Sequence, residues 1–361
     1  MTAALRPWLA SRLAVLVLTV AGAWQLADAE RGEVRGLVAS WDRWDAGLFR
    51  KVAEHGYQGY PDAYADRGVE AFFPGFPLVL ALVHRVVPDW TAAGLLVSLV
   101  AGGVASVFLA RLAALDGVPG PAAVTALVLS PYAVFLAAGY SEALFLALAL
   151  PGWWCARQGH WRAASLLVAG ATGVRISGLF LAAGLVVQYL VTTRGVRRDA
   201  VWLLAPVAVL AAWFGWLRAV TGDWTRWFDV QERYWGRSPT PPWEAFATTV
   251  AAAREGAQGA EYAWSFGAEV VAVLLGAGLT AVLLHRRAWG EATYVGLSVL
   301  ALATSSFYLS VARATLLWFP LWVLLAAAGT RRPALTTAYV AVSAPLMAVG
   351  VLVFTSGRWV G

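Results

Sequence analysis

The chain has 361 residues, of which 60% are hydrophobic and only 13% are charged, with a mean hydropathy of +0.65. A soluble globular domain carries about 25% charged residues, so this composition excludes that class and predicts a multi-pass membrane protein. The net charge of +6 does not indicate nucleic-acid binding, because most arginines stand in short clusters between apolar segments, as topology signals do.

Cysteine and histidine usage excludes two further kinds of chemistry. The chain has one cysteine, Cys155, so no intramolecular disulfide can form. Its four histidines are scattered along the chain without the spacing of zinc ligands, so we predict no tightly bound zinc.

Two basic residues, Arg6 and Arg12, precede the apolar stretch of residues 13–23, and the first expected span extends this stretch to residues 7–27. It is long enough to cross the membrane as a helix, which takes about 20 residues. Residues 27–29 resemble a signal-peptide cleavage site, so a removable signal peptide is the alternative. Because Trp24 fits a membrane-interface end, we expect the segment to be retained as the first helix.

Topology follows from keeping the basic clusters on the cytoplasmic side. The expected spans are residues 7–27, 91–111, 121–138, 141–156, 162–175, 177–193, 201–220, 267–285, 292–308, 311–328 and 335–355. These eleven crossings place the N-terminus in the cytoplasm and the C-terminus outside. The sequence thus predicts one transmembrane domain, residues 1–361.

Two long segments are expected on the outer face. Residues 28–90 form the first, with the apolar stretch 72–87 read as a re-entrant or interface segment that opens at Pro74 and Pro77. It is not assigned as a span because every later basic cluster would then move outside. The second segment, residues 221–266, is rich in tryptophan, which either forms an aromatic belt or lines a sugar or lipid groove.

The stretch after residue 40 combines amphipathic spacing with acidic residues. Its apolar side chains recur at helical spacing: Trp41, Trp44, Leu48 and Val52. This predicts a short interfacial helix with Asp42 and Asp45 on a neighbouring face. On periodicity alone, the two aspartates are either a solvated acidic edge or catalytic groups.

Three motifs in this region follow one another in a specific order: Arg43-Trp44-Asp45-Ala46, Ala53-Glu54-His55-Gly56-Tyr57 and Ala71-Phe72-Phe73-Pro74-Gly75-Phe76-Pro77-Leu78. They closely resemble the first-loop signature of the PIG-V family, whose eukaryotic members are the second mannosyltransferase of GPI-anchor assembly. Residues 130–145, 171–179 and 310–320 resemble further segments of that family. The resemblance covers roughly residues 35–320 and is weakest across 200–290.

This resemblance implies a fold and a reaction class. The fold is an all-α integral membrane protein, a GT-C-like polytopic helical bundle with short interfacial helices in its large first outer loop. GT-C enzymes are glycosyltransferases that use a polyprenyl-phosphate sugar donor at the outer face of a membrane. Mannose is the expected sugar by analogy. The high alanine and arginine content with a single lysine, Lys51, is typical of high-GC bacteria, so the expected location is a bacterial plasma membrane. Because most such bacteria make no GPI anchors, the expected acceptor is a lipid, glycan or protein of the cell envelope.

The resemblance also implies a catalytic carboxylate. Asp45 matches the family's Trp-Asp position and is the expected base that takes a proton from the acceptor hydroxyl. An aspartate with an ordinary pKa of about 3.9 is ionised at neutral pH and can take this role. Asp42 is the alternative base or an acceptor-binding group.

Positive charge is expected at the donor phosphate. Arg313 and Arg175 fall in family motifs at predicted outer ends of helices, and the guanidinium fork suits phosphate. Interfacial anchoring is the alternative role for both arginines.

The remaining candidates are substrate-binding residues. Tyr140 and Glu142 belong to the Tyr-Ser-Glu motif of residues 140–142, at an outer turn. Tyr140 is expected to bind substrate, and Glu142 either pairs with an arginine or contacts substrate. His55 and Tyr57 either hydrogen-bond sugar or phosphate, or fix the loop.

No cofactor is required by this scheme, because a lipid phosphate leaves without a general acid. Weak binding of Mg²⁺ or Mn²⁺ by the two aspartates is left open. The rival functions are a membrane transporter or flippase of lipid-linked sugar and a non-catalytic scaffold. A transporter would place ionisable residues at mid-span, whereas most charges here are expected at the outer face.

Overall fold

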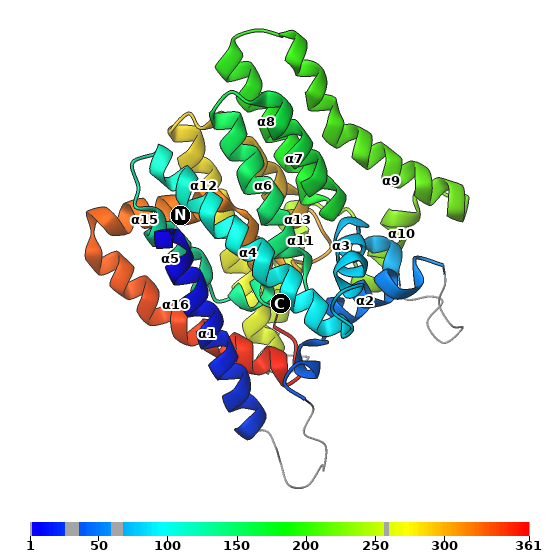
Figure 1. Cartoon of the computed structure of the whole chain (residues 1–361), viewed down its shortest axis with the longest axis vertical. Helices are drawn as coiled ribbons and strands as arrows, with labels where there is room; N and C mark the ends of the chain where they lie inside the picture. Colours follow the sequence, from blue (N-terminus) through cyan, green and yellow to red (C-terminus); the bar gives the residue numbers. More distant parts are fainter. Residues whose placement is uncertain (1, 26–35, 59–67, 256–259, 361) are drawn as a thin grey trace. The chain divides into compact units, whose positions relative to one another are not determined.

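The computed structural model describes residues 2–25, 36–58, 68–255 and 260–360, and these residues are almost entirely helical (Figure 1). The cleavage-like residues 27–29 lie outside the described residues. Contacts within the chain divide it into two compact units. Unit 1 comprises residues 1–56, 76–154 and 316–360, and unit 2 comprises residues 57–75 and 155–315.

Unit 1 holds the first helices and the last ones. They are α1 (Thr2–Gln25), η1 (Ala39–Trp41), α2 (Asp45–His55), α3 (Gly75–His84), α4 (Trp90–Leu115), α5 (Gly120–Val128), η4 (Ala133–Leu136), most of α6 (Ser141–Arg157), most of η6 (Thr315–Leu317), α15 (Phe319–Arg331) and α16 (Pro333–Thr355). In Figure 1, α1 (blue) lies along α4, α5 and α16, which it contacts.

The contact between α1 and α4 depends on a glycine. A methyl group at Gly102 would lie 2.1 Å from the ring of Trp8, which is buried against it. One turn further along α4, the hydroxyl of Ser106 donates to the Gly102 carbonyl at 2.8 Å. Gly102 therefore allows α1 and α4 to pack closely, whereas the Ser106 bond lies within α4.

Unit 2 holds the middle of the chain. Its elements are η3 (Val69–Ala71), α7 (Trp161–Val174), α8 (Ser177–Thr193), η5 (Arg198–Leu204), α9 (Ala205–Thr221), α10 (Arg226–Trp235), α11 (Pro242–Glu255), α12 (Ala260–His285), α13 (Trp289–Ala303) and α14 (Val311–Ala314). Helix α8 packs against α7 and α13, and α12 packs against α11 and α13. The turn between α7 and α8 admits only glycine at position 178, because a methyl group at Gly178 would lie 2.3 Å from the Thr172 backbone.

Five helices of the described residues are long and apolar enough to cross a membrane, or six if a broken pair counts as one span. The five are residues 3–24, 90–115, 198–221, 262–285 and 333–355. Each of the other predicted spans also contains helix, in shorter segments. The helical membrane architecture is thus as predicted, and the total of eleven crossings stays a prediction.

Two predicted spans are interrupted, both near proline. The span expected over 121–138 ends as α5 at Val128, and Pro131 precedes the short helix η4. The span expected over 311–328 is broken before α15, which has Pro320 in its first turn. Proline lacks the N–H that a continuing helix would use, which favours a break at these sites. It does not require one, since α1, α6 and α16 each continue through an internal proline.

The two expected outer segments contain helices of their own. Helix α3 has ten residues, so it is about 15 Å long and falls short of the roughly 30 Å hydrocarbon core. Pro74 and Pro77 lie at its start. The expected loop 221–266 is largely helical, because it contains α10, α11 and the beginning of α12.

Candidate active site

The short helix expected to include Trp41 and Trp44 begins later, so that prediction is wrong. Helix α2 starts at Asp45, and Trp44 before it has φ 51° and ψ −124°. A residue with positive φ cannot continue a right-handed helix, so η1 and α2 are separate elements. Asp42 and Asp45 therefore do not share one helix face.

The Tyr140 hydroxyl binds the backbone on both sides of Trp44, the residue with positive φ. This hydroxyl accepts the backbone N–H of Asp45 at 3.1 Å and donates to the carbonyl of Arg43 at 3.3 Å. These two backbone groups flank Trp44, whose conformation costs of the order of 1–3 kcal/mol. The buried tyrosine thus links the Trp-Asp motif to the Tyr-Ser-Glu motif.

Asp45 occupies the first turn of α2 and is 9% exposed. The carboxylate therefore lies at the N-terminus of this helix, among backbone N–H groups that have no partner within the helix. With this low exposure, little water surrounds the Asp45 carboxylate, although the residue still reaches the protein surface.

Asp42 has different surroundings. Its carboxylate lies 3.1 Å from a terminal nitrogen of Arg50, and both side chains are partly exposed. The positive charge of Arg50 is thus already paired with Asp42.

A buried aromatic cluster fixes the ring of Tyr140. Ring centroids lie 6.3 Å away for Phe49, 5.1 Å for Phe135 and 5.8 Å for Phe354, and Phe49 in turn lies 4.9 Å from Phe76. Such pairs favour edge-to-face contact and add about 0.5–1.5 kcal/mol each beyond the area that they bury. The cluster orients the hydroxyl that binds the backbone around Trp44.

The C-terminal end of α16 packs on the same motif. A terminal nitrogen of Arg43 donates to the Thr355 carbonyl at 3.3 Å. The Trp44 ring meets Trp359 edge-on at 5.1 Å. Gly357, with φ +86°, lies against Arg43, where a methyl group would come within 3.1 Å of the guanidinium. Residues distant in the chain therefore support the predicted catalytic segment.

Two other candidates complete the set in unit 1. Glu142 is fully buried in the first turn of α6. His55 ends α2, with a ring nitrogen 3.7 Å from a carboxylate oxygen of Glu54. Unit 1 thus contains Asp42, Asp45, His55, Tyr140 and Glu142.

Unit 2 contains Tyr57, Arg175 and Arg313. The Tyr57 hydroxyl donates to the Phe72 carbonyl at 2.9 Å, and its ring lies 5.0 Å from that of Trp213. The tyrosine therefore contacts both Phe72 and helix α9. Arg175 is an extended residue that ends α7 and acts electrostatically on the buried Tyr294.

Arg313 lies in the four-residue helix α14 and is 8% exposed. The three N–H groups that begin this helix donate to one carboxylate, that of Glu269 on α12. We did not predict Glu269 as a site residue. The sequence did contain an indication of it, because Glu269 is an isolated acidic residue inside the apolar span expected over 267–285.

The two expected outer segments also meet within unit 2. Nε and a terminal nitrogen of Arg226 in α10 donate to one oxygen of Glu70 at 3.0 and 2.7 Å. Next to this ion pair, the Trp227 indole donates to the Ala71 carbonyl at 3.2 Å. Helix α10 is therefore attached to η3 of the first segment.

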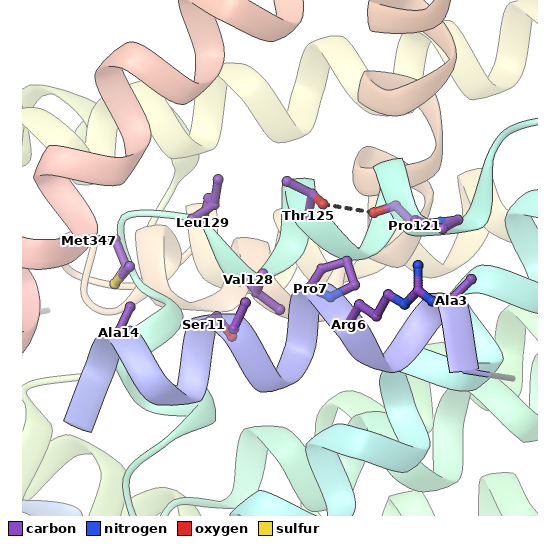
Figure 2. Close-up of a pocket in the computed structure, with 11 residues that line it drawn as sticks. Ala3, Arg6, Pro7, Ser11, Ala14, Pro121, Thr125, Val128, Leu129 and Met347 are labelled. Atoms are coloured by element: carbon purple, nitrogen blue, oxygen red, sulfur yellow. Dashed lines mark hydrogen bonds between the residues drawn. The ribbon is translucent and has the colours of Figure 1, made fainter. Parts of the chain in front are cut away.

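A groove of about 590 Å³ runs along α1, as Figure 2 shows. It is lined by α1 residues between Ala3 and Ala14, by α5 residues between Pro121 and Leu129, and by Met347. The lining is mostly apolar and includes none of the predicted site residues. Within the described part of the chain, no three His, Cys, Asp or Glu side chains gather as a metal site would require.

The helical fold can be compared with that of a known structure. It is similar to the crystal structure of ArnT from Cupriavidus metallidurans bound to undecaprenyl phosphate, with a TM-score of 0.52 and 18% identity. The alignment covers 93% of this chain and 64% of that one. Identity this low shows the fold alone, and it confirms the predicted GT-C-like polytopic helical fold.

The family resemblance rests on a shorter region. Residues 31–194 match the family model described as Mannosyltransferase (PIG-V). GPI alpha-1,6-mannosyltransferase 2 is 39% identical over 161 residues in Cricetulus griseus and 38% over 159 in Homo sapiens. Each match covers 40% of this chain and 31% of the relative.

These matches confirm the resemblance to the PIG-V family that the motifs indicated, and they support a glycosyltransferase. The matched region contains the Trp-Asp motif, Tyr140, Glu142 and Arg175. Arg313 lies outside it, so the family role assigned to that residue stays a prediction.

Proposed function

We propose that this chain is an inverting glycosyltransferase that transfers a mannosyl residue from a polyprenyl-phosphate donor. The observation that carries this proposal is the setting of Asp45. This carboxylate lies in the segment that matches the mannosyltransferase family, at the start of α2, and Tyr140 fixes its backbone.

The reaction follows from one carboxylate and one good leaving group. Asp45 takes the proton of an acceptor hydroxyl while that oxygen forms a bond to the anomeric carbon of mannose. The bond from this carbon to the phosphate oxygen breaks, and the electron pair leaves with the polyprenyl phosphate. Attack opposite to the leaving group inverts the anomeric configuration.

Asp45 suits the base better than Asp42 does. The Asp42 carboxylate already pairs with the Arg50 guanidinium at 3.1 Å, so one of its oxygens is engaged. We assign Asp42 to holding the motif segment in place.

Arg313 and Arg175 are the proposed phosphate-binding groups. A guanidinium can donate two parallel hydrogen bonds to phosphate oxygens and stabilise the charge that develops as the phosphate leaves. Arg313 is well suited because its side chain is mostly removed from water, where such hydrogen bonds are stronger.

The proposed reaction takes place at the outer face of a bacterial plasma membrane, with a lipid, glycan or protein of the cell envelope as acceptor. The arrangement of basic clusters supports this orientation. The attachment of α10 to η3 supports a common position for the two segments assigned to that face.

Transport of a lipid-linked sugar is less well supported. A transporter needs ionisable groups along a path at mid-span. Glu269 is an acidic residue inside a span, but three backbone N–H groups bind its carboxylate. That carboxylate holds a structural segment instead of lining a path.

The test uses the purified protein in lipid nanodiscs with radiolabelled polyprenyl-phosphate mannose and a bacterial envelope extract. We expect transfer by the wild type and a loss of roughly 10²–10⁴-fold in Asp45→Asn, with donor binding retained. Asp89→Asn is the matched control, because Asp89 only caps α4 at 2.7 Å and asparagine caps equally well. Donor that crosses the membrane unchanged, with no transfer to any acceptor fraction, would support the transporter instead.

A further inference from the structure

Glu269 is an acidic residue in the apolar helix α12 and is only 4% exposed. One oxygen accepts the N–H of Ser310 at 2.7 Å, and the other accepts those of Val311 at 2.6 Å and Ala312 at 2.9 Å. A buried carboxylate is tolerated only when such hydrogen bonds replace water. Charge-assisted bonds of this length are among the stronger ones in proteins.

The segment that Glu269 binds is under backbone strain. Ser310 has φ +61°, a left-handed conformation that residues other than glycine rarely adopt. From the other side, a terminal nitrogen of Arg237 donates to the carbonyl of Leu309 at 3.1 Å. Both sides of the turn are therefore held by charged side chains from other elements.

This turn leads directly to Arg313. The Glu269 carboxylate also interacts electrostatically with the Arg313 guanidinium. A helix of four residues does not by itself require an anion from another helix, since a local serine or threonine could satisfy the same N–H groups. The Glu269 carboxylate holds the backbone that leads to Arg313 and also places a negative charge near its guanidinium.

We propose that Glu269 is a positioning residue that orients Arg313 toward the phosphate of the polyprenyl-phosphate donor. This inference rests on the proposed function, in which Arg313 binds that phosphate. Glu269 holds the turn and reduces the reorganisation that Arg313 would otherwise undergo when the donor binds. Neutralising Glu269 therefore weakens donor binding more than it slows the chemical step.

The experiment compares Glu269→Gln with the wild type in nanodiscs, with the donor concentration varied. We expect the KM for the donor to rise about tenfold while kcat changes less than about threefold. The inhibition constant of polyprenyl phosphate should rise by the same factor, because this product presents the same phosphate. The pH profile of kcat should not move, since Asp45 is unchanged.

Glu291→Gln is the matched control. Glu291 is also a largely buried carboxylate of unit 2, and it pairs with Arg157 at 3.6 Å, away from the Ser310–Arg313 turn. Its KM should equal that of the wild type. In an Arg313→Gln background, Glu269→Gln should cause no further rise in KM, because the residue that it positions is already gone.

The outcomes separate the two proposals. No transfer by the wild type would overturn the proposed function. Wild-type transfer with an unchanged KM in Glu269→Gln, or with a loss in kcat alone, would overturn the positioning role and leave the transferase intact. If Glu269→Gln does not fold, Glu269→Asp replaces it: a raised KM at wild-type kcat supports the role, and an unchanged KM overturns it.

Discussion

The hydroxyl of Tyr140 lies 3.1 Å from the backbone nitrogen of Asp45, although the two residues are 95 positions apart in the chain. Two motifs that the sequence presents separately, Trp-Asp and Tyr-Ser-Glu, are thus parts of one arrangement. Their joint presence in the chain has a physical reason, because one motif supplies the group that holds the other.

Tyr140→Phe should reduce kcat about fivefold to tenfold, since it removes the two hydrogen bonds around Trp44 but keeps the ring. Such bonds contribute about 1 kcal/mol each to holding a structure. Transfer rates measure the effect, and circular dichroism checks folding. Tyr339→Phe is the control, because its hydroxyl also donates to a buried carbonyl, that of Ala126, but remote from the motif. Equal losses in both variants would contradict a specific role for Tyr140.

Asp42→Asn and Arg50→Gln should each change transfer by less than about threefold. Both side chains are partly exposed, and an ion pair of this kind contributes about 0–1 kcal/mol. The two variants should behave alike, because each breaks the same pair. Abolished transfer in Asp42→Asn alone would identify Asp42 as the base in place of Asp45.

Gly102→Ala should lower the free energy of unfolding by about 1–3 kcal/mol, because the new methyl group would overlap the Trp8 ring. Gly103→Ala is the neighbouring control. Its methyl group would lie 3.5 Å from the Trp8 indole nitrogen, an ordinary contact. Thermal unfolding in detergent measures both variants, and similar melting temperatures would show that α1 does not pack on α4 in this way.

Asp223 should stabilise the start of α10 in a pH-dependent manner. Hydrogen bonds from the backbone N–H and the hydroxyl of Thr225 hold the pKa of this exposed carboxyl below its ordinary value. A lowered pKa in the folded state adds stability above the unfolded pKa of about 3.9, and this is lost as pH falls through the folded value.

Asp223→Asn should therefore speed hydrogen exchange in residues 226–235 near pH 6. The difference from the wild type should shrink when the pH falls below about 4. Exchange measured for both proteins at each pH tests this. If the difference in exchange rate between the two proteins stays constant with pH, the stabilisation comes from the hydrogen-bond geometry of the side chain and not from its negative charge.

Chelation should leave transfer unchanged. The proposed scheme requires no general acid or metal, since a lipid phosphate is a good leaving group. Activity measured after EDTA treatment, with and without added Mg²⁺ or Mn²⁺, provides the check. A loss that either ion restores would show that the aspartates bind a cation during catalysis.

Much of the helical fold could be predicted from hydropathy, because an apolar segment in lipid must satisfy its own backbone. The breaks near Pro131 and before Pro320 could not be predicted from proline alone, because α1, α6 and α16 each continue through an internal proline. The start of α2 at Asp45 could not be predicted from the sequence. Trp44 adopts a positive φ because Tyr140 binds both of its flanking backbone groups, and periodicity within residues 41–52 carries no information about residue 140.

The candidate site shows the same limit. Motifs identify Asp45 and Arg175 because their residue types and neighbours are distinctive. The Arg50 partner of Asp42 and the hydrogen bonds of Glu269 depend on how helices meet in space. A single acidic residue in an apolar span could have drawn attention to Glu269, but its partners follow only from the folded chain.

The contact of Arg43 with Thr355 joins residues 312 positions apart, and this separation has a consequence for biogenesis. A ribosome that has just delivered the Trp-Asp motif to the membrane must still synthesise most of the described chain before α16 can reach it. Until α16 is inserted, the motif lacks the support of Thr355 and Trp359. If the proposed function holds, ribosome-bound chains halted before α16 should carry a complete motif without transferring sugar. Insertion of this late helix completes the contacts around the Trp-Asp motif.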